Sequence, residues 1–148
     1  PNVMMGYMRS SAPGIIEPTQ DGWHDTGDIV AIDEDHCIRI QGRVKRFAKI
    51  GGEMVSLAVV ENCASAIWPD DMHAAAAIPD PRKGEQIVLL STATDIDRAA
   101  ILAWAQSHGV SELSVPKKVF HVDEVPVLGT GKVDYGSVGK KVTELVEA

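Results

Sequence analysis

Apolar residues recur at helical spacing in three segments of the chain. The first spans 57–67, follows a serine that can cap a helix, and stops before Pro69. The second spans 97–108, between an aspartate that can cap its start and a glycine just past its end. The third follows Asp134, and its apolar residues form one stripe: Val138, Val142, Leu145 and Val146. Three helices are therefore predicted.

Shorter apolar runs, rich in β-branched residues, predict strands before and between these helices. The runs are 29–32, 37–40, 73–78, 85–93 and 117–122, with a further short one near 3–8. The acidic stretch 33–36 would join the first two runs as a hairpin. Gly51-Gly52 would join 47–50 to 53–55 as a smaller ribbon.

The order of these elements predicts an α+β fold in two parts. Residues 43–148 would form a small domain with a short β-ribbon, a three-stranded sheet and flanking helices. Residues 1–42 would form a strand-rich segment that ends in a β-hairpin. No flexible linker lies near Gly42, so the junction of the two parts is expected to be a hinge.

The composition is typical of a globular protein without a membrane span. Hydrophobic residues make up 45% and charged residues 24% of the 148 positions. No apolar run reaches the ~20 residues that a membrane span needs. The formal net charge of -7 argues against a general nucleic-acid binder. The start at Pro1 lacks the pattern of a signal peptide, and we expect the chain to be a fragment of a longer protein.

Cysteine and histidine usage gives no sign of disulfides or metal. Cys37 and Cys63 form neither a disulfide framework nor a CxxC pair, so we expect two buried thiols, reduced as in the cytoplasm. The histidines form no HExxH motif or helical ligand pair. No metal site is predicted.

Positive charge is concentrated beside a diglycine in the stretch 42–56. Four of the 14 Lys and Arg residues lie within 43–49, in a chain that is acidic overall. Gly51 and Gly52 follow, and backbone without a Cβ lets a ligand pass close to the main chain. The combination suits a site that handles an anion, although a solvated basic hairpin with a glycine turn is the alternative.

The sequence places a carboxylate and a guanidinium at one end of the predicted hairpin. Asp28 follows a glycine turn, where a carboxylate can accept both hydroxyls of a ribose. Arg43 follows the second strand, so both side chains can reach one sugar if the strands pair. The alternatives are a turn aspartate bonded to its own backbone and a surface arginine.

A glycine loop presents a single lysine in the stretch PVLGTGK at 126–132. The compact ammonium of Lys132 suits a phosphate or carboxylate whose charge develops in a transition state. The GxxxxGK[ST] spacing of a phosphate loop is absent. An exposed turn lysine is the alternative.

In this order, the stretches GWHDTGD, GRVKRFAKIGGEMVS and PVLGTGK resemble the closing motifs of the adenylate-forming enzymes, which include acyl-CoA synthetases, carrier-protein ligases and luciferases. The resemblance covers nearly the whole chain. It implies that 1–42 are the last strands of the large adenylating domain and that 43–148 are the mobile C-terminal lid domain. The isolated chain would be inactive, because it lacks the Ser/Thr/Gly-rich phosphate loop and a pocket for the acid.

The resemblance implies that Asp28 and Arg43 bind the ribose of ATP and of the acyl adenylate. Lys45 occupies the hinge position, about which the lid turns between two half-reactions. Many relatives have an aspartate there.

For the chemistry itself, the resemblance implies that Lys132 enters the site for adenylation and contacts the carboxylate and the α-phosphate. After the turn, Gly51 and Gly52 would line a tunnel for a phosphopantetheine arm, and Lys49 would face the site of the second step. Tyr135 stands where relatives often have a basic residue.

One branch of this family is especially similar in sequence to the stretch IQGRVKRFAKIGGEMVSL and to PNVMMGY upstream of it. That branch is the acyl-acyl carrier protein synthetase part of bacterial bifunctional 2-acylglycerophosphoethanolamine acyltransferases, which re-esterify lysophospholipid at the inner membrane. It implies a fatty acid as substrate, ATP with Mg²⁺ bound by the missing domain, and acyl carrier protein as acceptor. The basic ribbon, chiefly Arg46, would attract that acidic partner. The full-length protein would associate with the cytoplasmic face of the membrane, while this fragment would be soluble.

Two other functions fit the same motifs. One is the lid of a CoA-specific acyl ligase, with free CoA as acceptor. The other is a non-catalytic module that only docks carrier protein.

Overall fold

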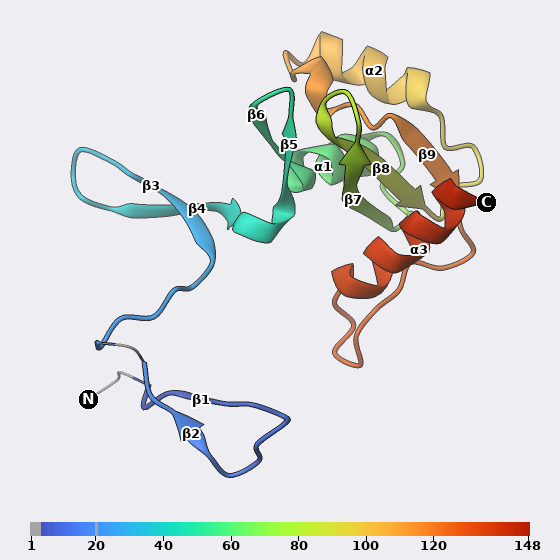
Figure 1. Cartoon of the computed structure of the whole chain (residues 1–148). Coiled ribbons are helices and arrows are strands. Elements are labelled where there is room, and N and C mark those ends of the chain that lie inside the picture. The colour runs from blue at the N-terminus through green and yellow to red at the C-terminus, as the bar shows by residue number, and fades with distance from the viewer. Residues whose placement is uncertain (1–3, 20) are drawn as a thin grey trace. The chain divides into compact units, whose positions relative to one another are not determined.

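The computed structural model describes residues 4–19 and 21–148. Backbone contacts divide the chain into two compact units, here called unit 1, which ends at Gln41, and unit 2, which spans Gly42–Ala148 (Figure 1). The boundary predicted between residues 42 and 43 lies next to this division.

Unit 1 is built from short strand pairs. β1 (Tyr7–Met8) pairs with β2 (Ile16–Glu17), and β3 (Asp28–Ile32) pairs with β4 (Ile38–Arg43). The second pair is the predicted hairpin, and Asp33 closes its turn by accepting hydrogen bonds from the backbone N–H groups of Asp35 and Cys37. The strand predicted near 3–8 is reduced to β1, and Val3 lies outside the described residues.

The apolar side chains of unit 1 are exposed rather than packed into a core. Trp23 is 84% exposed and Ile40 is 71% exposed. Among the described residues, both clusters of buried apolar side chains lie in unit 2. The prediction of two buried thiols is accordingly right for Cys63 and wrong for Cys37, because Cys37 lies at the hairpin turn, where it is exposed.

Unit 2 is organised around a five-stranded sheet. Its strands are β5 (Phe47–Ile50), β6 (Glu53–Ser56), β7 (His73–Asp80), β8 (Gly84–Ser91) and β9 (Lys118–His121). β8 is central: it runs antiparallel to β7 along its length and parallel to β9 on the other side. The predicted three-stranded sheet is therefore β7, β8 and β9. The predicted ribbon of β5 and β6 is joined to it through the pair Ile50–Gly84.

Three α-helices cover the two faces of this sheet (Figure 1): α1 (Leu57–Ile67), α2 (Arg98–Ser107) and α3 (Tyr135–Glu147). Side chains of β8 alternate between the faces. Ile87 and Leu89 pack in the cluster with α1 and α2, whereas Val88 and Leu90 pack in the cluster with α3. Among the described residues no helix has the length and apolarity that crossing a membrane requires.

The helix starts follow the predicted capping chemistry in two of three cases. Asp97 accepts a hydrogen bond from Ala100 N, and Asp134 accepts from the first free N–H groups of α3. Ser56 occupies the N-cap position of α1, but its side chain makes no capping bond. Because Asp134 caps α3, the chain is held firmly in place just after Lys132.

Candidate functional site

Side chains of the turn before β3 accept hydrogen bonds from its backbone. Asp25 Oδ1 accepts from Gly27 N at 2.8 Å, and Thr26 Oγ1 accepts from Asp28 N at 3.2 Å. Asp28 begins β3, and Arg43 ends the strand that pairs with it.

The predicted hinge residue lies in a single helical turn between two extended segments. Lys45 is the middle residue of the 3-10 helix η1 (Val44–Arg46), and its side chain is exposed. The flanking residues Arg43 and Phe47 both have extended backbone angles. A short turn with poor hydrogen-bond geometry between extended residues is a suitable pivot, because few bonds resist a change of its dihedral angles.

Arg46 is not available to attract an acidic partner, so that expectation is wrong. Its guanidinium pairs with Glu61 at 2.6 Å, and the side chains of the pair are only 15% and 14% exposed. The Tyr135 ring stacks on the guanidinium, with its centroid 3.6 Å from Cζ. The exposed cations of this stretch are Arg43, Lys45 and Lys49.

The diglycine forms the turn between β5 and β6. Gly51 has φ +60° and Gly52 has φ +95°, values that residues with a side chain rarely adopt. A Cβ at either position would meet no atom within 4 Å, so the turn faces open space. Gly52 and Lys49 border an open groove of about 480 Å³ together with residues 83–85. The structure therefore places Lys49 and Gly52 along one groove, whose lining does not include Gly51.

The lysine loop, residues 126–134, is a tight hairpin. Leu128 N donates to Lys132 O at 2.7 Å, and Asp134 N donates to Pro126 O at 2.9 Å. Val127 and Val133 form an antiparallel bridge between the two arms. Lys132 is exposed near the tip, so its ammonium can meet a ligand from outside unit 2.

The lysine loop and the diglycine turn lie at opposite ends of unit 2. In Figure 1 the β5–β6 turn is at the upper left of unit 2, and the loop before α3 is at its lower edge. The structure therefore does not bring Lys132 to the groove of Lys49 and Gly52.

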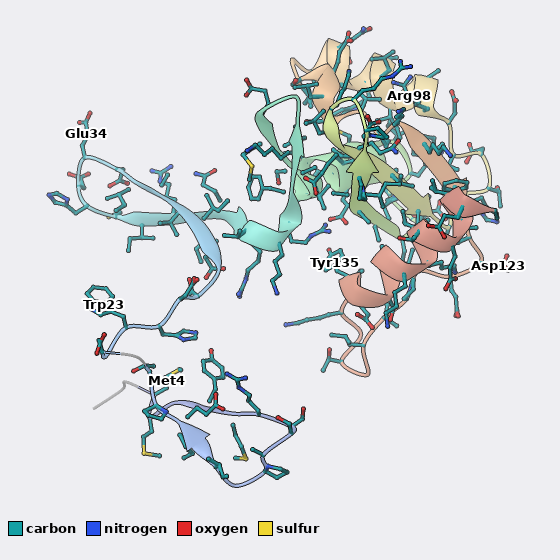
Figure 2. The ribbon with its side chains drawn as sticks, in the orientation of Figure 1. Met4, Trp23, Glu34, Arg98, Asp123 and Tyr135 are labelled. Atoms are coloured by element: carbon teal, nitrogen blue, oxygen red, sulfur yellow. The ribbon has the colours of Figure 1, made fainter. Side chains whose placement is uncertain are left out.

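A basic cavity that the sequence reasoning missed adjoins the diglycine groove. It has a volume of about 300 Å³, and four basic residues line it together with three acidic ones: Arg82, Lys83, Arg98, Lys117, Asp80, Glu85 and Glu112. Lys83 and Glu85 border both this cavity and the groove. Figure 2 shows Arg98 on α2 above this part of the sheet. The basic pairs after Pro81 and Pro116 were the only signal in the sequence.

Asp80 fixes the turn that carries Lys83. Its carboxylate, 6% exposed, accepts hydrogen bonds from the backbone N–H groups of Arg82 and Lys83 and pairs with Lys117 Nζ at 2.7 Å. The hydrogen bond from Lys117 and those from the turn lower the pKa of Asp80 from 3.8 to about 2. The ionised carboxylate therefore holds the β7–β8 turn against the start of β9.

This low pKa predicts that unit 2 loses stability in acid through Asp80. Above about pH 5 the carboxylate is ionised in both the folded and the unfolded chain, and its stabilising effect is complete. As the pH falls from about 5 towards 2, the unfolded chain, whose carboxyl has a pKa of 3.8, takes up the proton first, so the free energy of unfolding decreases. Urea denaturation followed by tryptophan fluorescence should show a smaller decrease over this window for Asp80→Asn than for the unchanged chain. Equal decreases would contradict the assignment.

The described residues contain no group of three or more His, Cys, Asp or Glu side chains placed to hold a metal ion.

Comparison with known proteins places these features in a family context. No protein-family model matches the chain. The chain is 33% identical over 144 residues to a feruloyl-CoA synthase of an Amycolatopsis species, covering 95% of this chain and 29% of that enzyme. It is 30% identical over 146 residues to the 2,3-dihydroxybenzoate-AMP ligase of Bacillus subtilis, covering 97% of this chain and 27% of that protein.

Solved structures give the same result. ATP-bound MatB from Rhodopseudomonas palustris superimposes with a TM-score of 0.67 at 26% identity, over 86% of this chain and 26% of that one. A Mycobacterium tuberculosis fatty acyl CoA synthetase superimposes with a TM-score of 0.66 at 25% identity, over the same shares. The chain thus spans less than a third of the length of the curated relatives it matches. Its motifs, fold and relatives agree, and the chain belongs to the adenylate-forming, acyl-CoA synthetase-like superfamily, with unit 2 matching the C-terminal domain of these enzymes.

Proposed function

We propose that the chain is the C-terminal part of an ATP-dependent ligase that joins a carboxylic acid to a thiol in two steps. The observation that carries the proposal is the placement of the lysine loop and the diglycine groove at opposite ends of one small unit that begins beside a pivot. The relatives include a CoA synthase and an AMP ligase by name, which supports the same two-step chemistry. Because the chain spans only part of those proteins, the activity is proposed for the full-length protein.

In the first step, a carboxylate oxygen attacks the α-phosphorus of ATP, giving acyl-AMP and releasing pyrophosphate. Negative charge is redistributed over the α-phosphate and the bridging oxygen as the bond to pyrophosphate breaks. An ammonium fixed beside these oxygens lowers the barrier, because it is placed before the reaction begins. Lys132 is the exposed cation of a bonded hairpin and suits this role, while Asp28 and Arg43 would hold the ribose. The N-terminal domain would supply Mg²⁺ and the phosphate loop.

In the second step, a thiol sulfur attacks the acyl carbon, the thiol proton is lost, and AMP leaves. Lys132 would then occupy the path of the incoming thiol, so the lid must turn before this step. The turn about Lys45 would replace the lysine loop with the β5–β6 edge. The bare backbone at Gly51 and Gly52 leaves room for a phosphopantetheine arm, and Lys49 lines the groove along which the arm would lie.

The favoured acceptor is free CoA rather than a carrier protein. CoA carries its phosphopantetheine arm on a nucleotide with further phosphates, so it needs cations beyond the end of the arm. The cavity with Lys83 and Arg98 adjoins the diglycine groove and offers cations at that place, whereas Lys117 is already paired with Asp80. Relatives named as CoA synthases and CoA ligases support the same assignment.

Acyl carrier protein is the second candidate acceptor. It presents the same arm, which the groove can take equally well, and Lys45 and Lys49 remain exposed for an acidic partner. Long-chain fatty acid as substrate, the attached acyltransferase and the role in lysophospholipid reacylation rest on the sequence resemblance alone. A non-catalytic docking module is the third reading.

Assays of the full-length protein distinguish these three candidate functions. ATP–pyrophosphate exchange would be measured with palmitate, ferulate and 2,3-dihydroxybenzoate, and the best acid would then be offered with CoA or with holo acyl carrier protein. We expect exchange with at least one acid and thioester formation on CoA. Thioester on carrier protein alone would favour the second candidate. Binding of carrier protein without any exchange would favour the docking module and contradict the proposal.

If the basic cavity binds CoA, removing one of its cations should weaken CoA binding. Lys83→Ala in the full-length protein should raise KM for CoA about fivefold, because an exposed charge contact contributes up to about 1 kcal/mol. KM for ATP should not change. Lys140→Ala, an exposed lysine on α3 outside the cavity, is the matched control and should leave both constants unchanged. Equal effects of the two substitutions on CoA would count against the cavity as part of the acceptor site.

A further inference from the structure

A largely buried ion pair closes the free edge of the sheet just beyond the pivot. β7 lies at the edge of the sheet order, so one side of its backbone has no strand partner among the described residues. Glu61 Oε1 accepts from Ala75 N at 2.8 Å, and Arg46 Nη1 donates to Ala75 O at 2.8 Å. The two side chains, which are themselves paired, thus replace a neighbouring strand at Ala75. This arrangement joins η1, α1 and β7 into one body.

Tyr135 connects the lysine loop to the same body. It is the first residue of α3, three positions after Lys132, and its ring stacks on the Arg46 guanidinium with the centroid 3.6 Å from Cζ. Its hydroxyl lies 3.4 Å from Glu61 Oε2. Figure 2 shows Tyr135 projecting from the start of α3 towards the η1 segment. Burial, and then the charge of Glu61, raise the pKa of Tyr135, so the phenol remains a donor to that carboxylate at neutral pH.

We propose that Arg46, Glu61 and Tyr135 are positioning residues for adenylation, which fix the lysine loop to the segment that leaves the pivot. Arg46 follows Lys45 directly, so rotation at Lys45 is passed on at once to a rigid cluster. Because Tyr135 contacts this cluster, the lysine loop would rotate together with it, and Lys132 would reach one defined position at the nucleotide site. A displacement of about 1 Å at a reacting group can cost about 10²-fold in rate, so a loose loop would be a serious loss. The inference rests on the proposed function.

The test uses the full-length protein and separates the two half-reactions. Acyl-AMP formation would be followed by ATP–pyrophosphate exchange with the best of the three acids named above, and thiol transfer by CoA consumption from preformed acyl-AMP. We expect Tyr135→Ala to lower kcat of exchange about tenfold while KM for ATP changes less than about twofold, because stacking and loop placement are lost but not ATP contacts. Thiol transfer should change less than about threefold, since Lys132 has left the site in that step. Tyr135→Phe retains the ring and should restore exchange to within about twofold.

A double variant distinguishes a positioning residue from a stabilising one. If Tyr135 acts through Lys132, Lys132→Ala with Tyr135→Ala should exchange no more slowly than Lys132→Ala alone. The inference would be overturned, with the proposed function intact, if the two substitutions reduced the exchange rate by factors that multiply in the double variant. It would also be overturned if Tyr135→Ala reduced the rates of both half-reactions equally. So would a loss with Tyr135→Phe as large as with Tyr135→Ala. An unchanged exchange rate in Lys132→Ala alone would instead remove the proposed function, and the positioning role with it.

Discussion

Replacing Lys132 by alanine in the full-length protein is expected to slow acyl-AMP formation by about 10²- to 10³-fold, the usual cost of one preorganised group that stabilises developing charge. Lys132 is exposed on a hairpin whose backbone is closed without its side chain, so the substitution should not disturb the fold. Thiol transfer from preformed acyl-AMP should remain within about threefold of the unchanged protein, because the account removes Lys132 from the site in that step. ATP–pyrophosphate exchange and CoA consumption measure the two rates.

The control for Lys132 is Lys140→Ala, which removes another exposed lysine, on α3, that makes none of the backbone hydrogen bonds that close the lysine loop. It should leave both rates unchanged. If Lys132→Ala reduced exchange less than about fivefold, or reduced both half-reactions alike, the lysine would not be the charge-stabilising group of adenylation.

Replacing Lys45 by proline should separate the rates of the two half-reactions by about 10²-fold. Proline fixes φ at its own position and restricts the residue before it, so it favours one conformation of η1 over any other. The penalty for a backbone conformation that proline does not fit is about 3 kcal/mol, which corresponds to about 10²-fold in population. One lid orientation, and with it one half-reaction, should therefore be lost while the other is retained.

Lys45→Ala is the matched control, because it removes the same charge and leaves the backbone free. The rates of both half-reactions in Lys45→Ala should stay within about threefold of those of the unchanged protein. If proline slowed the two half-reactions equally, or neither, the pivot would not lie at residue 45.

Features that depend on neighbours in sequence were predictable. Asp134 caps α3 because a carboxylate before a helical stripe bonds the first free N–H groups, and the 33–37 turn closes for similar local reasons. The Gly51-Gly52 turn followed from the need for positive φ between two short strands.

Features that depend on distant residues were not predictable from spacing. Arg46 was expected to face a partner, but its bonding partners lie 15 and 29 positions away in Glu61 and Ala75. The basic cavity collects residues from the β7–β8 turn, α2 and the start of β9, which only the fold brings together. The exposure of Cys37 likewise depends on which layers cover a hairpin, and no local pattern reports that.

The central claim, that two edges of unit 2 take turns at one nucleotide site, can be tested by a distance between spin labels. Cys37 is an exposed native thiol on the β3–β4 hairpin, Cys63 is only 1% exposed and should not react, and Thr130→Cys places a second label in the lysine loop. In the full-length protein, with other reactive cysteines replaced, electron double resonance would be recorded with ATP and acid, and then with a non-hydrolysable acyl-adenylate analogue and CoA. The account predicts two distinct distances, one for each condition, and a single distance in Lys45→Pro. One unchanged distance under both conditions in the protein with Lys45 intact would contradict it.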